Sequence, residues 1–96
     1  MRKISKQSIE SFLNAKAFKI SNTKVLVKQT TVELYLWDNM IAYYVIGINK
    51  IHIQNCGWFT KTTKDRLCAL PNVSIRSSKG VWFLNGVEWN GQIKSI

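Results

Sequence analysis

The N-terminal stretch of the chain shows the spacing of an amphipathic helix. Over residues 5–16, Ile9, Phe12 and Leu13 stand at i, i+3 and i+4, which places them on one helical face. Ser5 precedes this stripe and is predicted as the N-cap, because its hydroxyl can accept a hydrogen bond from a free backbone N–H of the first turn. The pattern therefore predicts a helix that buries one apolar face.

After this helix the apolar positions recur with a period of two, which is typical of β-strands. In the second predicted strand, Val32, Leu34 and Leu36 alternate with polar and aromatic residues, so we expect an aliphatic core face and an opposite face that carries aromatic rings. Asp38 and Asn39 form a predicted turn, since both tolerate left-handed backbone. The strands predicted in this half of the chain span residues 24–29, 31–37, 40–46 and 50–54.

A second, shorter helix is predicted in the middle of the chain. Thr62 or Thr63 can cap its N-terminus with a hydroxyl group. Leu67 and Leu70 stand three positions apart and give the helix a narrow apolar stripe. Pro71 ends the helix, because the residue before a proline is driven towards extended backbone.

The C-terminal region predicts a tight hairpin. Asn85-Gly86 is a strong signal for a type I′ turn, because both central residues of that turn need positive φ. Asn90-Gly91 follows and is expected to lead the tail away from the sheet. The strands predicted in this region span residues 73–76, 81–84 and 87–89.

These elements run in the order α-β-β-β-β-α-β-β-β along a chain of 96 residues. The links between successive strands are short, so a parallel crossover can pass only through the second helix. We therefore predict an α+β fold, in which a mostly antiparallel, twisted sheet carries two short helices. A chain of this length has room for one hydrophobic core, so residues 1–96 are predicted as a single domain.

The chain is strongly basic, with 14 Lys and Arg against 5 Asp and Glu, a net charge of +9 and a pI near 9.9. Such an excess favours polyanionic partners such as nucleic acid or an acidic protein face, although many small domains are basic for solubility alone. The excess is greatest in the N-terminal third, where it predicts either a cationic surface or a solvated lead-in to the first helix. The residues predicted for this surface are Arg2, Lys3, Lys6, Lys16 and Lys19.

Several classes of function are disfavoured. No apolar run approaches the roughly 18 residues of a membrane span, and no signal-peptide core follows the basic start, so a cytoplasmic protein with reduced thiols is predicted. Cys56 and Cys68 match no zinc pattern. His52 and Cys56 lack a third residue to orient them as a catalytic pair, and the glycines form no phosphate-binding loop. We therefore predict a protein that is not an enzyme and uses no metal or cofactor.

Aromatic residues are frequent, with four Trp, three Tyr and four Phe. Exposed rings near Lys and Arg stack on single-stranded nucleic acid or on nucleotide bases, and they also form hot spots in protein interfaces. The alternative is that these rings fill the core of a small sheet. The residues predicted to form an aromatic face are Tyr35, Trp37, Tyr44 and Trp58.

The polar start of the second predicted helix offers a candidate anion site. Free backbone N–H groups and the helix dipole favour a phosphate at such a position. The residues predicted for this anion or partner site are Thr62, Thr63, Lys64 and Arg66. In the alternative, which we favour, the threonines cap the helix and Arg66 bonds Asp38, Glu88 or backbone carbonyls.

Two segments resemble a group of small phage-encoded proteins of unknown function. The first is the pattern Gly-Trp-x-Thr-x-Thr-Thr-Lys-x-Arg-Leu at residues 57–67, and the second is the hairpin Trp-aromatic-Leu-Asn-Gly-x-x-Trp at residues 82–89. The resemblance covers approximately residues 31–91 and departs from the group at Cys68, where asparagine is more frequent. It implies a bacteriophage origin and a site of action in the host cytoplasm, and it carries over no catalytic residues.

Three functional hypotheses follow. The leading one, by analogy with other short phage proteins, is an accessory protein for host takeover or anti-defence that binds and inhibits a host or defence macromolecule. The second is direct nucleic-acid binding, which would weaken steeply with salt. The third is a nucleotide-signal sponge, in which Thr62, Lys64 and Arg66 grip phosphate while a Trp stacks on the base. A host protein is thus the leading expected partner, and nucleic acid is the alternative.

Overall fold

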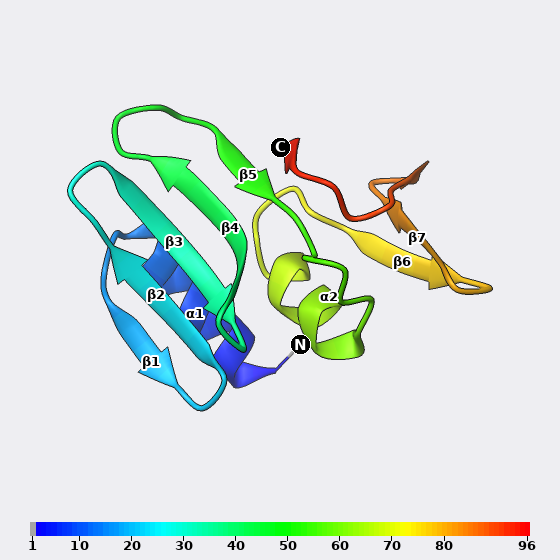
Figure 1. The fold of residues 1–96 in the computed structure, drawn as a ribbon, viewed down its shortest axis with the longest axis horizontal. Helices are drawn as coiled ribbons and strands as arrows, with labels where there is room; N and C mark the ends of the chain where they lie inside the picture. The colour runs from blue at the N-terminus through cyan, green and yellow to red at the C-terminus, as the bar shows by residue number, and fades with distance from the viewer. Residues whose placement is uncertain (1) are drawn as a thin grey trace.

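The computed structural model describes residues 2–96, which form two helices and nine strands (Figure 1). The helices are α1 (Lys3–Leu13) and α2 (Lys61–Cys68), and neither is long and apolar enough to cross a lipid bilayer. The strands before α2 are β1 (Phe18–Ile20), β2 (Thr23–Val27), β3 (Thr31–Leu36), β4 (Asn39–Val45) and β5 (Ile51–Ile53). The strands after α2 are β6 (Ile75–Ser78), β7 (Val81–Leu84), β8 (Val87–Glu88) and β9 (Lys94–Ser95).

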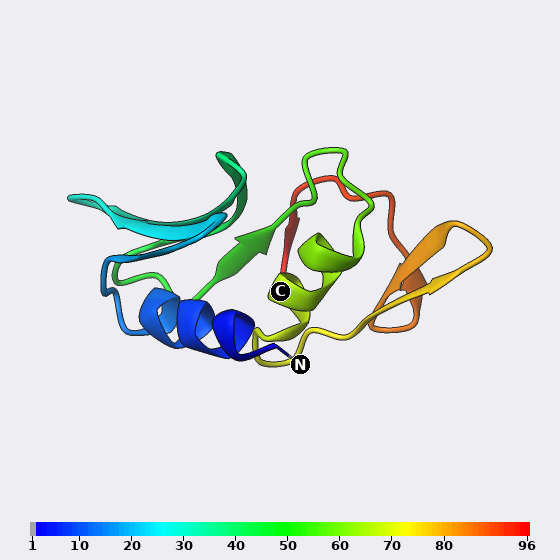
Figure 2. The same cartoon turned by 90° about the horizontal axis from the view of Figure 1, so that it is seen from below.

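The strands form two antiparallel sheets. The larger sheet has the order β1-β2-β3-β4-β5-β9, and the smaller one has the order β6-β7-β8. Figure 2 shows α1 beneath one face of the larger sheet, while the opposite face of β2 and β3 has no helix of residues 2–96 across it. The α+β class and the antiparallel pairing are confirmed, whereas the single sheet that we expected is divided in two.

Strands β1 and β9 were not predicted. They contain three and two residues, which is too short for a period of two to show. β9 pairs with β5 and places Lys94 opposite Ile53, so it returns the tail to the edge of the larger sheet. After Asn90-Gly91 the tail leaves the sheet of the β7–β8 hairpin, as predicted, but it then joins the larger sheet, which was not predicted.

The aliphatic core face predicted for β3 is confirmed. Its buried members are Val32, Leu34 and Leu36. Ile9 and Phe12 of α1 join them in one core cluster. Leu13, by contrast, is 43% exposed. Because α1 ends at this residue, beside the loop between β4 and β5, the Leu13 side chain lines an open groove there, and its predicted burial is wrong.

Both helices begin earlier than predicted. The N-cap of α1 is Arg2, so Ser5 lies inside the helix, where it is buried. The N-cap of α2 is Thr60, whose hydroxyl accepts a hydrogen bond from the Thr63 N–H at 3.2 Å. Ser5, Thr62 and Thr63 were therefore wrongly predicted as caps. The pattern identified both helices but placed their N-caps two or three residues too late.

Three hairpin turns have the type I′ signature of positive φ at both central residues, and one of them is Lys79-Gly80 between β6 and β7, with φ values of 52° and 79°. Asn85 and Gly86 have φ values of 50° and 87° and join β7 to β8, as predicted. Between β3 and β4 the two positions are Trp37 and Asp38, with φ values of 49° and 64°. The turn predicted at Asp38-Asn39 thus lies one residue earlier. The shift matters because it places the Trp37 ring at the tip of the hairpin.

Candidate functional site

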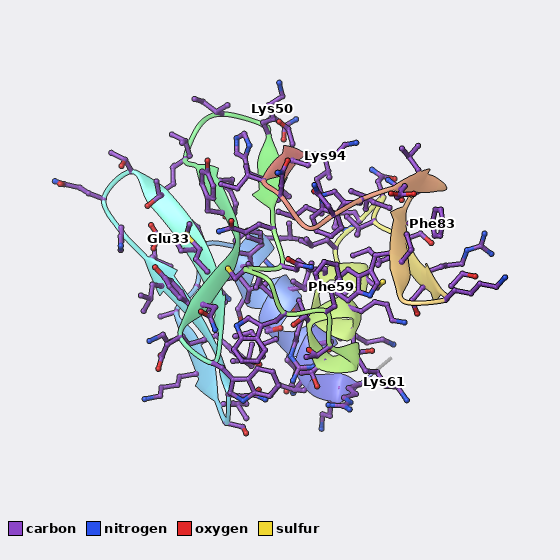
Figure 3. The ribbon with its side chains drawn as sticks, turned by 45° about the vertical axis from the view of Figure 1, so that its right-hand side comes forward. Glu33, Lys50, Phe59, Lys61, Phe83 and Lys94 are labelled. Atoms are coloured by element: carbon purple, nitrogen blue, oxygen red, sulfur yellow. The ribbon has the colours of Figure 1, made fainter. Side chains whose placement is uncertain are left out.

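Three half-exposed aromatic rings lie on neighbouring loops at one end of the larger sheet. Trp37 in the β3–β4 turn and Trp58 in the loop before α2 have ring centroids 6.5 Å apart. Phe59 follows Trp58 near the start of α2 (Figure 3) and makes an edge contact with the buried Trp82 at 5.2 Å. The exposed fractions of Trp37, Trp58 and Phe59 are 47%, 49% and 50%. We call these three residues the aromatic cluster.

Asn55 fixes the loop that carries two of these rings. It is buried, with an exposed fraction of 1%. Its side-chain oxygen accepts the Gly57 N–H at 2.9 Å, and its carbonyl accepts the Trp58 N–H at 2.9 Å. The Asn55 N–H donates to the Gly91 carbonyl at 3.1 Å, which ties the loop to the C-terminal tail. The loop is therefore ordered by its own hydrogen bonds, without any partner.

The aromatic face predicted from the sequence is only partly assembled. Trp37 and Trp58 come together, but Tyr44 lies on the other side of the sheet, against α1. The Tyr44 hydroxyl donates to the Phe12 carbonyl at 2.6 Å, and the two rings meet edge-to-face at 5.0 Å. Tyr44 is opposite Val32, a core position, so its prediction as part of the exposed face is wrong.

Tyr35 lies on the face of β3 that no helix of the described chain covers (Figure 2), which we call the open face. Its hydroxyl contacts the carboxylate of Glu33, a residue labelled in Figure 3. The Tyr35 hydroxyl donates to Glu33 at 2.6 Å, the Thr31 hydroxyl donates at 3.0 Å, and the Lys28 ammonium lies at 3.0 Å. Burial tends to raise the pKa of the Glu33 carboxyl, but the three donors outweigh this effect and the pKa lies below its ordinary value. The bond to Glu33 raises the pKa of Tyr35 to about 12. The open face therefore holds a paired carboxylate at its centre.

Protonation of Glu33 is expected to destabilise the fold in acid. Its folded pKa lies below the ordinary value of 4.5, so the ionised carboxylate stabilises the protein above that pH, and this contribution is lost as pH falls through the folded pKa. Glu33→Gln should be less stable than the wild type near neutral pH and should lose part of the acid sensitivity. Urea unfolding of both proteins from about pH 7 to about pH 3 measures this difference. Identical pH dependences would contradict it.

Arg66 lies in the interior, where its guanidinium joins α2 to α1 and to the β1–β2 hairpin. Its exposed fraction is 2%. Nε donates to the Thr23 hydroxyl at 3.0 Å, and Nη1 donates to the Ser5 hydroxyl at 2.7 Å and lies 3.4 Å from the Asp65 carboxylate. Nη2 donates to the Asn22 side-chain oxygen at 3.5 Å, and the Ser5 hydroxyl donates to Asp65. Burial lowers the pKa of Arg66, while the Asp65 charge raises it.

Because of this network, the four residues of the anion site predicted at the start of α2 are not assembled. Thr63 and Arg66 are buried, whereas Thr62 and Lys64 are partly exposed. The four residues therefore do not face one common surface, and a phosphate on the surface of α2 does not reach all of them. Arg66 has a structural role, as in the alternative that we favoured, but that alternative named other partners for it and other caps for α2. It bonds neither of the acids that were suggested for it, Asp38 and Glu88.

The five residues predicted for the basic surface are all exposed. Arg2, Lys3 and Lys6 lie at the start of α1, Lys16 follows its C-terminal end, and Lys19 is in β1. They are thus distributed along the helix and the adjoining edge strand. Of the five, Lys19 lines a groove that also contains a residue of the aromatic cluster.

This groove runs beside the β1–β2 turn and has a volume of about 300 Å³. Its lining includes Lys19, Asn22, Thr23, Lys24, Trp37 and Asp38. Lys24 forms an ion pair with Asp38 at 3.0 Å and lies 5.3 Å from the centre of the Tyr35 ring. We call this cavity the β1–β2 groove. Together with the aromatic cluster it brings flat rings and cationic groups to the same end of the molecule.

Comparison with known families finds one match across nearly the whole chain. A family model described as "Kyanoviridae Gp96 protein" matches residues 1–94. This range includes the aromatic cluster, the β1–β2 groove and both segments on which the resemblance to phage proteins rests. No curated protein and no solved structure matches the chain.

Proposed function

The chain belongs to the Kyanoviridae Gp96 protein family, a family of phage proteins, and from this premise we propose that it is a non-enzymatic accessory protein that binds a host or defence macromolecule. The observation that carries the proposal is the aromatic cluster, because it leaves three large rings half exposed on a well-ordered surface. Phage origin agrees with the resemblance of residues 57–67 and 82–89 to small phage proteins.

The cluster has the composition and rigidity of a protein-binding hot spot. Tryptophan is among the residues most enriched in hot spots, where a few aromatic anchors supply most of the binding free energy. Asn55 holds the Trp58 loop through backbone hydrogen bonds, and Trp37 occupies a two-residue turn. Because these segments are already ordered, a partner would lose little binding free energy to their immobilisation.

Cationic residues at the rim favour a partner with an acidic surface around an apolar pocket. Lys61 is exposed at the first position of α2 (Figure 3), and Lys19 is exposed in the adjoining groove. Charges of this kind act mainly on the association rate and on partner choice, whereas the buried aromatic anchors act on the dissociation rate. We therefore infer that the aromatic rings set affinity and the lysines set selectivity.

Replacement of Trp58 by alanine is expected to weaken capture of a host protein by about tenfold or more, since loss of a hot-spot side chain costs at least ~2 kcal/mol. A tagged wild-type protein and the Trp58→Ala variant are incubated with host lysate, and captured proteins are quantified by mass spectrometry. Phe83→Ala, which removes a partly exposed ring from the smaller sheet, is the matched control and should capture the partner normally.

Nuclease treatment separates this proposal from direct nucleic-acid binding. A host protein that survives nuclease and is lost only with Trp58→Ala supports the proposal. Loss of every captured protein after nuclease, together with a steep decline of binding between low and moderate salt, would replace it by nucleic-acid binding. Equal capture by the wild type and Trp58→Ala would exclude the aromatic cluster as the binding surface.

A further inference from the structure

We propose that the β1–β2 groove, which shares Trp37 with the aromatic cluster, is a binding site for a phosphate-bearing nucleotide, with the phosphate between Lys19 and Lys24 and the base stacked on Trp37. The shared chemistry is an aromatic base joined to phosphate, whether it comes as a free nucleotide or as one unit of a single strand. This site differs from the one predicted at the start of α2, and it does not depend on capture of a host protein by the aromatic cluster.

The first observation is that the two lysines stand directly opposite each other. Lys19 in β1 is the cross-strand partner of Lys24 in β2, in the middle of a hairpin that is only three residue pairs long. Like charges in directly opposed positions destabilise an antiparallel pair. Lys24 has Asp38 as an ion-pair partner, whereas Lys19 has none within residues 2–96. A phosphate between the two ammonium groups would compensate Lys19 and would share Lys24 with the exposed Asp38 carboxylate.

The second observation is that two residues of the groove lining are held by the buried Arg66. Asn22 and Thr23 line the groove, and each accepts a hydrogen bond from the Arg66 guanidinium, at 3.5 Å and 3.0 Å respectively. The guanidinium is oriented with Nη1 towards the Asp65 carboxylate and Nη2 towards the groove. These bonds orient the Asn22 and Thr23 side chains, while the Arg66 charge itself is paired with Asp65. Arg66 acts here through Asn22 and Thr23, without touching the ligand.

The third observation is the aromatic wall. Trp37 lines the groove and is about half exposed, so a face of its indole ring is available to a flat ligand. Stacking on an aromatic side chain is largely independent of base identity, because every base has a π-face. The groove volume of about 300 Å³ lies at the small end of the range for ligand pockets, which suits a single nucleotide unit.

The open face of the larger sheet is less suited to the same ligand, although it also carries rings. Tyr43 and His52 stack there at 4.8 Å, but Glu33 is the cross-strand partner of Tyr43. Its lowered pKa keeps this carboxylate ionised at neutral pH. Asp38 of the groove has a side chain that is 87% exposed and can turn into solvent, whereas that of Glu33 is 11% exposed and is held by Tyr35 and Thr31. A phosphate close to Tyr43 would therefore meet a fixed negative charge, which makes Tyr43 a discriminating control.

The test measures binding of adenosine monophosphate by calorimetry and of a fluorescein-labelled single strand of roughly 12 nucleotides by anisotropy, both at low salt. Adenosine and inorganic phosphate serve as partial ligands. The test variants are Lys19→Thr and Trp37→Asn. Threonine suits an exposed strand, and asparagine suits the positive φ of a type I′ turn, so both variants should fold. The controls are Lys94→Thr, at the opposite edge of the sheet (Figure 3), and Tyr43→Ala.

We expect both test variants to weaken binding by roughly 5- to 100-fold, as expected for the loss of one stacking partner or one phosphate contact, and both controls to bind like the wild type. Lys19→Thr should also keep or raise the melting temperature, because it removes the charge opposite Lys24. If Lys19 were only structural, its replacement would not abolish binding while the melting temperature stays the same or rises. Binding of the monophosphate identifies a free nucleotide as sufficient, and binding of the strand alone identifies a unit of a longer chain. The proposal is overturned if the wild type binds neither probe, if Lys19→Thr and Trp37→Asn bind normally, or if binding is lost with Tyr43→Ala instead.

Discussion

Replacement of Arg66 by alanine is expected to lower the free energy of unfolding by about 3–5 kcal/mol, the range typical of removing one partner from a buried ion pair. The guanidinium makes hydrogen bonds to Thr23 and Ser5 and faces Asp65, and it is almost completely buried. Alanine would leave these polar groups without a donor in the interior and would open a cavity between α1, α2 and the β1–β2 hairpin. A loss of this size is a large part of the stability of a small domain.

Urea unfolding at neutral pH measures this effect, and Lys64→Ala on the same helix is the matched control. Lys64 is partly exposed and bonds only the Ser77 hydroxyl, at 3.2 Å, so its loss should cost less than about 0.5 kcal/mol. Ser5→Ala combined with Arg66→Ala should cost less than the sum of the two single changes, because both remove the same hydrogen bond. A loss below about 1 kcal/mol for Arg66→Ala would show that the network contributes little.

Replacement of Gly91 by alanine is expected to lower the free energy of unfolding by about 2–5 kcal/mol, as the sum of backbone strain and overpacking. Gly91 has a φ of +88°, a conformation that costs energy for any residue with a Cβ atom. The added methyl group would also overlap with the side-chain amide of the buried Asn55. The Asn55 side chain cannot turn away without losing the hydrogen bond that it accepts from the Gly57 N–H, and the Asn55 backbone is held in place by its bond to the Gly91 carbonyl.

Gly47 provides the matched control for this prediction. Its φ of +90° is nearly the same, but a methyl group there has no neighbour within 4 Å. Gly47→Ala should therefore cost only the strain of about 1–2 kcal/mol. The difference between the two variants, measured by thermal or urea unfolding, isolates the overlap with Asn55. Equal losses would mean that the Asn55 loop adapts freely to the added methyl group.

The Gly91 variant also tests whether the tail supports the binding surface. Asn55 is hydrogen-bonded both to the tail and to the backbone of Trp58, so displacement of Asn55 should disturb the aromatic cluster. Near-ultraviolet circular dichroism of the tryptophans should change in Gly91→Ala and remain the same in Gly47→Ala. Capture of the host partner should decline in parallel with that change.

Local features of this chain were predictable because their physical cause is local. The Asn85-Gly86 turn was predictable because a type I′ turn needs positive φ at two successive residues, and asparagine followed by glycine suits that requirement. The buried face of β3 follows from strict alternation, since Val32, Leu34 and Leu36 all point to one side of a strand. The phage resemblance was likewise carried by short segments of sequence, and the family match confirms it.

Strand faces with apolar residues on both sides could not be assigned from the pattern. Residues 40–46 are apolar or aromatic throughout, so periodicity does not say which face is buried. The pairing of β4 with β3 shifts register between Leu34 and Tyr35, and both Ile41 and Ala42 are buried as a result. Tyr44 is thereby directed towards α1, on the face opposite to the predicted one.

The sequence by itself determined the class of fold, the order of the main elements, the hairpin turns of the C-terminal half and the abundance of cationic and aromatic groups. The tertiary structure alone decided which of these groups meet. Ser5 and Arg66 bond across 61 positions, and of the four rings predicted for one aromatic face, Trp37 and Trp58 meet whereas Tyr44 turns to α1. Propensity and periodicity report the conformation of neighbouring residues, whereas contacts between distant segments depend on how whole elements pack, and the candidate sites of this protein are built from such contacts.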